Sequence, residues 1–174
     1  RKYWLFSSTV HNRSMFTLSQ AGALAPELPA KSILPELKDA LETAGKVIVS
    51  AEPGSGKTTL VPPICWALED ARAKNSSSAA GVIVTEPRRI AARAAASYLQ
   101  ALLPRNEYDL AAKVAFSVRG ESTRGRNTRL DFVTAGLFLR RLLADPEISG
   151  IGTVIIDEVH ERSLDTDVLL ALLS

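Results

Sequence analysis

Two short segments that lie far apart in the chain carry residue types suited to phosphate chemistry. Residues 53–59 form a glycine-rich turn with one lysine and two threonines, and Asp157 and Glu158 follow the apolar run 152–156. Such a turn ahead of a helix binds phosphates with its backbone amides, and a carboxylate at a neighbouring strand end holds magnesium. Together the two segments predict a site for a magnesium-bound nucleoside triphosphate.

Each residue of the glycine-rich turn has an expected part in nucleotide binding. Gly54 and Gly56 let the backbone wrap around an anion without a Cβ clash, and the start of the following helix adds the positive end of its dipole. Lys57 adds a charge for the β and γ phosphates. The contacts expected in this turn are Pro53, Gly54, Ser55, Gly56, Lys57, Thr58 and Thr59.

The carboxylates of Asp157 and Glu158 would repel each other unless a cation or a hydrogen-bond donor lies close to them. We expect Asp157 to hold magnesium together with the Thr58 hydroxyl, and Glu158 to orient or deprotonate the attacking water. The predicted metal-site residues are Thr58, Asp157 and Glu158, and the predicted catalytic residues are Lys57, Asp157 and Glu158.

His160 is poorly placed to be a zinc ligand, because only His11 and Cys65 could join it. We therefore interpret His160 as a relay between the nucleotide site and a polynucleotide-binding face or a second lobe. Cys65 is the only cysteine, which excludes disulfides within the chain and cysteine-rich metal sites. This usage fits a reducing compartment and predicts a cytoplasmic protein.

The apolar pattern of the chain alternates between strand and helix signals. Strands are expected at residues 46–50, 81–85, 113–118, 130–134 and 153–156, and helices at residues 34–41, 58–73, 90–103, 136–143 and 164–173. Strands that alternate with helices predict an α/β fold, a parallel, doubly wound sheet with helices on both faces.

The length of 174 residues and a hydrophobic content of 46% allow one α/β core. Residues 1–30 are predicted to be an extension outside that core, because residues 1–26 contain no acidic residue and are broken by polar ones. The domain is expected at residues 31–174. Its apolar last helix runs to the end of the chain, which predicts a truncation before a further lobe.

A formal net charge of +2 permits nucleic-acid binding without requiring it. Any basic surface must therefore come from local clustering, as in the arginine-rich segment 119–129. No apolar run approaches the roughly 18 residues that a membrane helix needs.

The motifs in this order resemble those of superfamily 2 helicases of the DEAH type, and the chain is most similar to bacterial HrpB-type ATP-dependent helicases. The resemblance covers residues 34–174 and rests on residues 54–59, 86–93, 118–121, 127–130, 133–137 and 156–163. It implies a RecA-like P-loop NTPase domain, the first lobe of an ATP-dependent RNA helicase, with ATP and Mg²⁺ as cofactors.

The resemblance also implies a groove for single-stranded RNA. Its residues would be Pro87, Arg88, Arg89, Arg119, Thr134 and Gly136. The start of a helix at Arg88 and Arg89 is a good place for a phosphate. Contacts of this kind are made to the phosphate backbone of the nucleic acid, so we expect little sequence preference and a strong salt dependence of binding. The alternative is that these arginines and those of segment 119–129 are solvated or paired with Glu86, Glu121 and Asp131.

Two departures from the family pattern bear on the expected function. Tyr98 stands where the family commonly has an arginine that stacks on adenine, and an aromatic ring could stack there or simply pack the helix. The Ser-Ala-Thr motif and the second RecA-like lobe are missing from the sequence, so we expect this fragment to bind nucleotide better than it hydrolyses it.

Two other functions stay open. One is an RNA-binding or adaptor fragment that does not cycle, against which Lys57, Thr58 and Glu158 argue. The other is a different P-loop ATPase, such as a DNA-directed helicase. The sequence does not separate RNA from DNA, because recognition of the 2′-hydroxyl depends on geometry.

Overall fold

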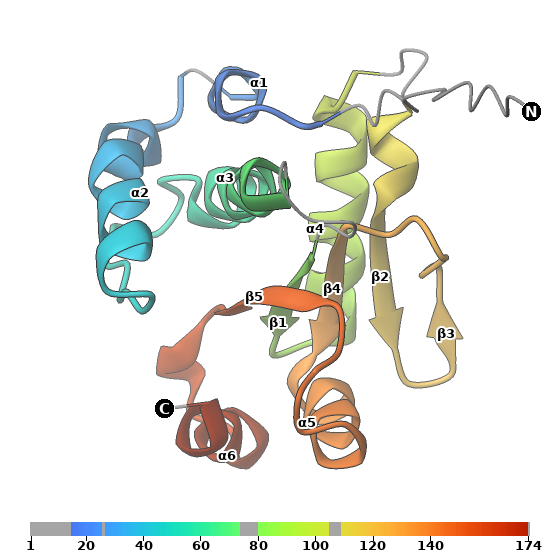
Figure 1. Cartoon of the computed structure of the whole chain (residues 1–174). Coiled ribbons are helices and arrows are strands. Elements are labelled where there is room, and N and C mark those ends of the chain that lie inside the picture. Colours follow the sequence, from blue (N-terminus) through green and yellow to red (C-terminus); the bar gives the residue numbers. More distant parts are fainter. Residues whose placement is uncertain (1–14, 26, 74–79, 105–108, 174) are drawn as a thin grey trace, which may run out of the picture.

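The computed structural model describes residues 15–25, 27–73, 80–104 and 109–173. Its centre is a five-stranded sheet in the order β3-β2-β4-β1-β5, in which the short β3 runs antiparallel to β2 and the other neighbours are parallel (Figure 1). The strands are β1 Gly81–Glu86, β2 Val114–Val118, β3 Glu121–Ser122, β4 Leu130–Thr134 and β5 Ile151–Ile156.

Helices connect these strands and cover both faces of the sheet. The α-helices are α1 Leu18–Ala23, α2 Leu34–Thr43, α3 Lys57–Arg72, α4 Arg89–Leu102, α5 Ala135–Ala144 and α6 Leu164–Leu173. Short 3-10 helices are η1 Pro29–Ile33, η3 Leu110–Lys113 and η4 Val159–Glu161. The predicted helices and four of the five predicted strands are therefore confirmed within a few residues.

The alternation of side chains along β1 divides the core into two clusters. Val82 and Val84 point into the cluster packed by α3 and α4, whereas Ile83 points into the cluster packed by α5 and α6. In Figure 1, α5 and α6 lie together at the bottom of the view, apart from α3 and α4. Because successive strand residues face opposite sides, a strand that is buried throughout requires helices on both faces. The doubly wound prediction is confirmed.

The predicted strand at residues 46–50 is wrong. The segment has no strand structure, and the side chain of Ile48 is 95% exposed. β5 is an edge strand whose residues are only half-buried, and no described strand lies between it and this segment. A strand forms only when its amides and carbonyls find a neighbouring strand. The apolar composition of residues 46–50 would fit a buried strand only if such a neighbouring strand were present.

The prediction that residues 1–30 lie outside the core is corrected for the part that is described. Phe16 is 1% exposed, and its ring lies 4.5 Å from that of Trp66 on α3. Helix α1 begins with a capping box between Thr17 and Gln20. Residues 1–14 and Pro26 lie outside the described residues. A single buried aromatic side chain leaves no periodic signal in the sequence, which is why the packing was missed.

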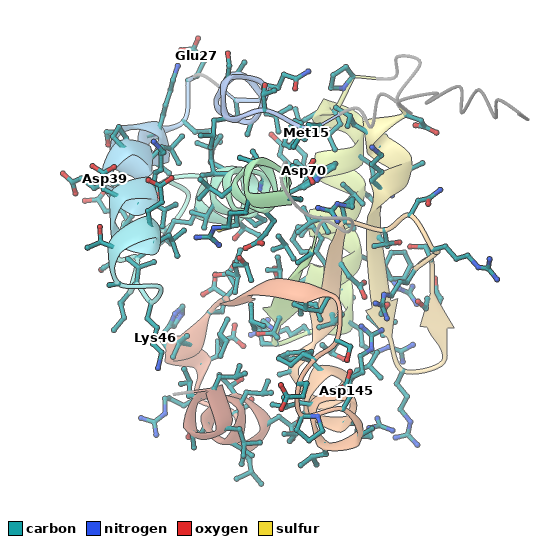
Figure 2. The ribbon with its side chains drawn as sticks, viewed as in Figure 1. Met15, Glu27, Asp39, Lys46, Asp70 and Asp145 are labelled. Carbon is teal, nitrogen blue, oxygen red and sulfur yellow. The ribbon has the colours of Figure 1, made fainter. Side chains whose placement is uncertain are left out.

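Asp70 joins this N-terminal segment to the sheet (Figure 2). Its carboxylate accepts hydrogen bonds from the Phe16 amide at 2.9 Å and the Trp66 indole at 3.1 Å, and it is paired with Arg129. Asp70 is 6% exposed. A buried carboxylate is stable only with such partners, so one side chain holds three parts of the chain together.

We expect Asp70→Ala to lower the free energy of unfolding by about 3–5 kcal/mol, because it removes the buried carboxylate that pairs with the partly buried Arg129. Urea unfolding of the chain measures this loss. Asp39→Ala, an exposed position on α2, is the matched control and should change the free energy by less than about 0.5 kcal/mol. Equal effects of the two substitutions would contradict the role of Asp70.

Candidate active site and nucleic-acid interface

The glycine-rich turn forms the expected phosphate loop ahead of α3. Gly54 and Gly56 have φ values of 75° and 91°, in the left-handed region that favours glycine. Gly56 is the N-cap of α3, and a Cβ added to it would lie 2.4 Å from Leu28 Cδ1. Glycine at position 56 is therefore required both by the backbone conformation and by the chain segment behind the loop.

Lys57 is folded back on the loop that it belongs to. Its Nζ donates to the carbonyl oxygens of Ala51 at 2.6 Å and Glu52 at 3.0 Å. A phosphate in the loop would offer the ammonium a charged acceptor in place of these carbonyls. The lysine is thus held within the loop and is available to a bound anion.

The two predicted segments meet through Thr58 and Asp157. The Thr58 hydroxyl donates to Asp157 Oδ2 at 2.5 Å, although the residues lie 99 positions apart in the chain. Asp157 is held in place because its amide donates to the carbonyl of Thr85 on β1 at 3.1 Å. This contact brings together two of the oxygen donors that the sequence predicted for a metal ion.

The donor set at this contact fits magnesium. Mg²⁺ prefers oxygen ligands and is usually bound by one or two protein side chains, with phosphate oxygens and waters completing the octahedron. Thr58 and Asp157 supply such oxygens. Within the described residues no group of three or more His, Cys, Asp or Glu side chains could hold a metal by itself.

Glu158 begins a strained turn directly after Asp157. Its φ of 50° is unusual for a residue with a side chain, and Arg162 at the other end of η4 has a φ of 48°. Glu158 Oε2 lies 3.2 Å from Nε2 of His160, and both side chains are largely exposed. Strained backbone at such a position is common in functional sites. The predicted catalytic carboxylate and the predicted relay residue are thus in direct contact.

Glu86 is a buried acid that the sequence analysis did not place in the site. It ends β1, is 3% exposed, and its Oε1 has no hydrogen-bond partner among the described residues. The pKa of Glu86 is raised from 4.5 to about 8, mostly by burial and in addition by the charges of Asp157, Glu158 and Glu161. Glu86 therefore holds a proton at neutral pH beside the carboxylates of the site.

The predicted RNA contacts lie at the carboxyl ends of three neighbouring strands. Arg119 follows β2, Thr134 ends β4, and Pro87 follows β1, and these strands are adjacent and parallel. In this register Glu86 is opposite Thr134. The acidic pair follows β5, which is paired with β1 on its other side. The carboxyl ends of these strands thus carry the predicted nucleic-acid contacts and the metal-site carboxylate side by side.

The basic residues near this edge differ in their partners. Arg89 and Arg119 are exposed and make no ion pair with any described residue. Arg124 lies 3.8 Å from the buried Asp131, and Arg129 is turned inward to Asp70. The alternative of paired arginines is therefore correct for Arg124 and Arg129, whereas Arg89 and Arg119 are available to phosphates.

Thr134, Gly136 and Tyr98 were also predicted to contact ligands. Thr134 is the N-cap of α5, and Gly136 lies so close to Asp165 of α6 that an added Cβ would be 2.5 Å from its Oδ2. Close packing of α5 on α6 is thus a second reason for glycine there. Tyr98 is 54% exposed on α4, with an open surface for stacking. The ligand contacts of these three residues stay predictions.

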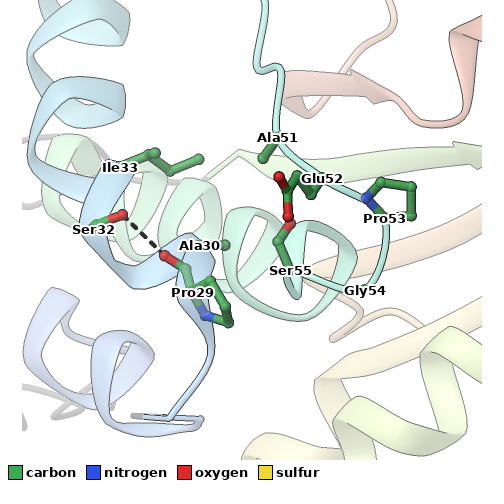
Figure 3. A pocket seen from close by; sticks show the side chains of 9 residues that line it. All are labelled: Pro29, Ala30, Ser32, Ile33, Ala51, Glu52, Pro53, Gly54 and Ser55. Carbon is green, nitrogen blue, oxygen red and sulfur yellow. Dashed lines mark hydrogen bonds between the residues drawn. The ribbon is translucent and has the colours of Figure 1, made fainter.

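A hollow of about 290 Å³ lies between η1 and the phosphate loop (Figure 3). It is lined by residues 29, 30, 32 and 33 on one side and residues 51–55 on the other. The Ala30 amide donates to the Ser55 carbonyl at 2.9 Å, so η1 supports the loop from behind. The sequence analysis missed this support, for which Pro29 at the start of η1 was the available signal.

Comparison with known proteins bears on these features. The profile of the DEAD/DEAH box helicase family matches residues 31–168. The chain belongs to the DEAD/DEAH box helicase family. It is 43% identical over 146 residues to the ATP-dependent RNA helicase HrpB of Escherichia coli, covering 84% of this chain and 17% of that protein. It is 38% identical over 150 residues to human ATP-dependent RNA helicase DHX30, covering 86% of this chain and 12% of that protein.

Solved structures agree with the sequence comparison. The chain matches a crystal structure of Escherichia coli DEAH/RHA helicase HrpB with a TM-score of 0.70 and 41% identity, covering 84% of this chain and 18% of that one. The RecA-like fold and the resemblance to HrpB-type helicases are therefore confirmed. The chain spans less than a fifth of the length of the helicases it matches.

Two further features of the structure concern the single cysteine and the lengths of the helices. Burial raises the pKa of the Cys65 thiol to about 12, which agrees with a small buried side chain and not a reactive one. Among the helices of the described ranges, none has the length and apolar character needed to cross a bilayer.

The raised pKa of Glu86 predicts a pH-dependent stability. Between pH 4.5 and 8 the folded chain keeps a proton on Glu86 that the unfolded chain has released, so raising the pH favours unfolding. Glu86→Gln removes this effect. We expect the variant to gain stability over the wild type by up to about 1.4 kcal/mol per pH unit within this window. Urea unfolding across that range without magnesium measures the difference, and a difference independent of pH would contradict the assignment.

Proposed function

We propose that this chain is the first RecA-like, ATP-binding lobe of an ATP-dependent RNA helicase, whose parent couples ATP hydrolysis to remodelling of RNA. The observation that carries the proposal is the contact of Thr58 with Asp157 beside a glycine-rich loop. Hard oxygen donors at that point would coordinate the magnesium ion of a triphosphate bound in the loop. The names of the relatives, which are ATP-dependent RNA helicases, support the same assignment.

The residues around the loop would share the work of binding. The backbone of residues 53–56 and the start of α3 would surround the β and γ phosphates, and Lys57 would move from its loop carbonyls to those phosphates. Thr58 and Asp157 would hold the magnesium ion, which when bound neutralises the developing charge on the phosphates. Thr59 and Tyr98 are proposed to contact the remainder of the nucleotide.

Glu158 is proposed to act on the attacking water. Its carboxylate directly follows the metal-site residue and is 42% exposed in its side chain, so a water molecule has access to it. The neighbouring His160 is a positioning residue that restrains this carboxylate. A positioned base is sufficient to orient water in related phosphoryl transfers, but transition-state charge also needs an arginine. We propose that a second lobe supplies it, so this chain alone is weakly active or inactive.

The nucleic-acid partner is proposed to lie along the carboxyl edge of β2, β4 and β1. Pro87, Arg88 and Arg89 would contact it from the start of α4, Arg119 from the end of β2, and Thr134 and Gly136 from the start of α5. These are contacts to phosphates and sugars, which favours single strands of any sequence. RNA is preferred over DNA because the relatives are RNA helicases. A cytoplasmic location is part of the proposal.

Lys57→Ala tests the nucleotide site. We expect it to weaken binding of labelled Mg·ADP by at least about tenfold, since hydrogen bonds to charged groups contribute about 1.5–3 kcal/mol each. Glu158→Gln should keep the affinity, because it changes the proposed catalytic group and not the phosphate contacts. Lys38→Ala, on the exposed face of α2, is the control. Unchanged affinity in Lys57→Ala would refute the site.

Arg89→Ala and Arg119→Ala test the nucleic-acid face. Each should weaken binding of a labelled oligouridine, and each lost phosphate contact should lower the slope of log K against log salt by about 0.7. Arg72→Ala is the control, because that arginine pairs with Glu69 at the end of α3. An unchanged salt slope in both variants would remove these arginines from the interface. Parallel titration with oligodeoxyuridine separates RNA from DNA.

A further inference from the structure

The turn after the acidic pair is held from the side of the nucleic-acid face. Arg88, at the N-cap of α4, donates from Nη2 to Glu161 Oε1 at 2.9 Å. The two residues are 73 positions apart, and they stand at the ends of two adjacent parallel strands, β1 and β5. This ion pair is a direct link between a predicted phosphate contact and the segment that carries Glu158.

The turn itself has little else to hold it. No residue of η4 is buried, and Glu158 and Arg162 at its two ends have left-handed φ values of 50° and 48°. A second contact holds the other end of the turn, the pair of Arg162 with Asp167 on α6. A strained, exposed segment with few buried contacts changes conformation at low energetic cost. Its position therefore depends on the charges that hold it.

Arg88 is in a position to exchange partners. Its side chain is 73% exposed, so a phosphate of a bound strand can reach the guanidinium. Phosphate and carboxylate compete for the same donors of an arginine. Binding of a strand at Arg88 and pairing with Glu161 therefore oppose each other.

We propose that Glu161 is a positioning residue that couples the two sites of the proposed helicase lobe: a nucleic-acid phosphate displaces Glu161 from Arg88, and the released carboxylate strengthens binding of the magnesium-bound nucleotide. The inference rests on the proposed function. The sign applies to the magnesium ion of the nucleotide, because an unpaired carboxylate near Asp157 and Glu158 favours a nearby cation. The charge of Glu161 does reach this edge of the sheet, since it contributes to the raised pKa of Glu86.

Glu161→Gln in the whole 174-residue chain is the decisive variant. It removes the competitor for Arg88, so affinity for a labelled oligouridine at low salt should rise about two- to fivefold, the value of an exposed ion pair. In an Arg88→Ala background the same substitution should give no gain. Glu42→Gln, which breaks the exposed pair with Lys38 on α2, is the matched control and should change nothing.

The coupling is measured with labelled Mg·ADP in the absence and presence of saturating oligouridine. In the wild type, bound oligouridine should tighten the binding of Mg·ADP about two- to fivefold. Bound Mg·ADP should tighten the binding of oligouridine by the same factor. Glu161→Gln should abolish this mutual effect while each ligand still binds alone. Asp167→Asn frees the other side of the turn without releasing Arg88, so it should not raise strand affinity.

The contrary outcomes are distinct. Strand affinity that is unchanged or lower in Glu161→Gln, or an equal gain in Asp167→Asn, would overturn the role of Glu161 and leave the proposed function intact. A wild-type chain that binds neither Mg·ADP nor oligouridine would overturn both. Should Glu161→Gln fail to fold in urea titration, Glu161→Asp supplies the same test, because its shorter side chain weakens the pair.

Discussion

The parallel pairing of β1 with β4 on one side and with β5 on the other is the constraint on which the site depends. Parallel strands end at the same edge of a sheet, so the segments that follow them meet there whatever their separation in sequence. The phosphate loop joins this edge because α3 packs on β1 and β5. The contact of Thr58 with Asp157 is the local result of that arrangement.

The same edge gathers charge of both signs. Glu86, Asp157, Glu158 and Glu161 come from β1 and from the turn after β5, and burial together with the charges of the other three raises the pKa of Glu86. Arginines arrive at the same place from the ends of β1 and β2. A nucleotide with its metal ion and a strand of nucleic acid would each compensate part of this charge. The proposed electrostatic coupling between the two ligands would therefore follow from strand order.

The outermost strand of the sheet, β5, has a different character from the central strands. β5 is an edge strand with half-buried apolar residues, and Ile48 in the segment between α2 and the phosphate loop is nearly fully exposed. By contrast, β1 is buried along its whole length between two neighbours. An apolar segment forms a buried strand only where neighbouring strands and helices cover it. Among the described residues, this holds for β1, β2 and β4.

The sequence by itself determined the phosphate loop, the acidic pair, the alternation of strands and helices and the family, because these depend on local periodicity and on residue types at fixed spacing. Tertiary structure alone decided which arginines face outward and which pair with Asp70 or Asp131, and that Glu86 is buried with its Oε1 unpaired among the described residues. It also decided that Phe16 enters the core and that residues 46–50 form no strand. Those outcomes depend on which distant neighbours a residue meets, and no local pattern encodes the neighbours.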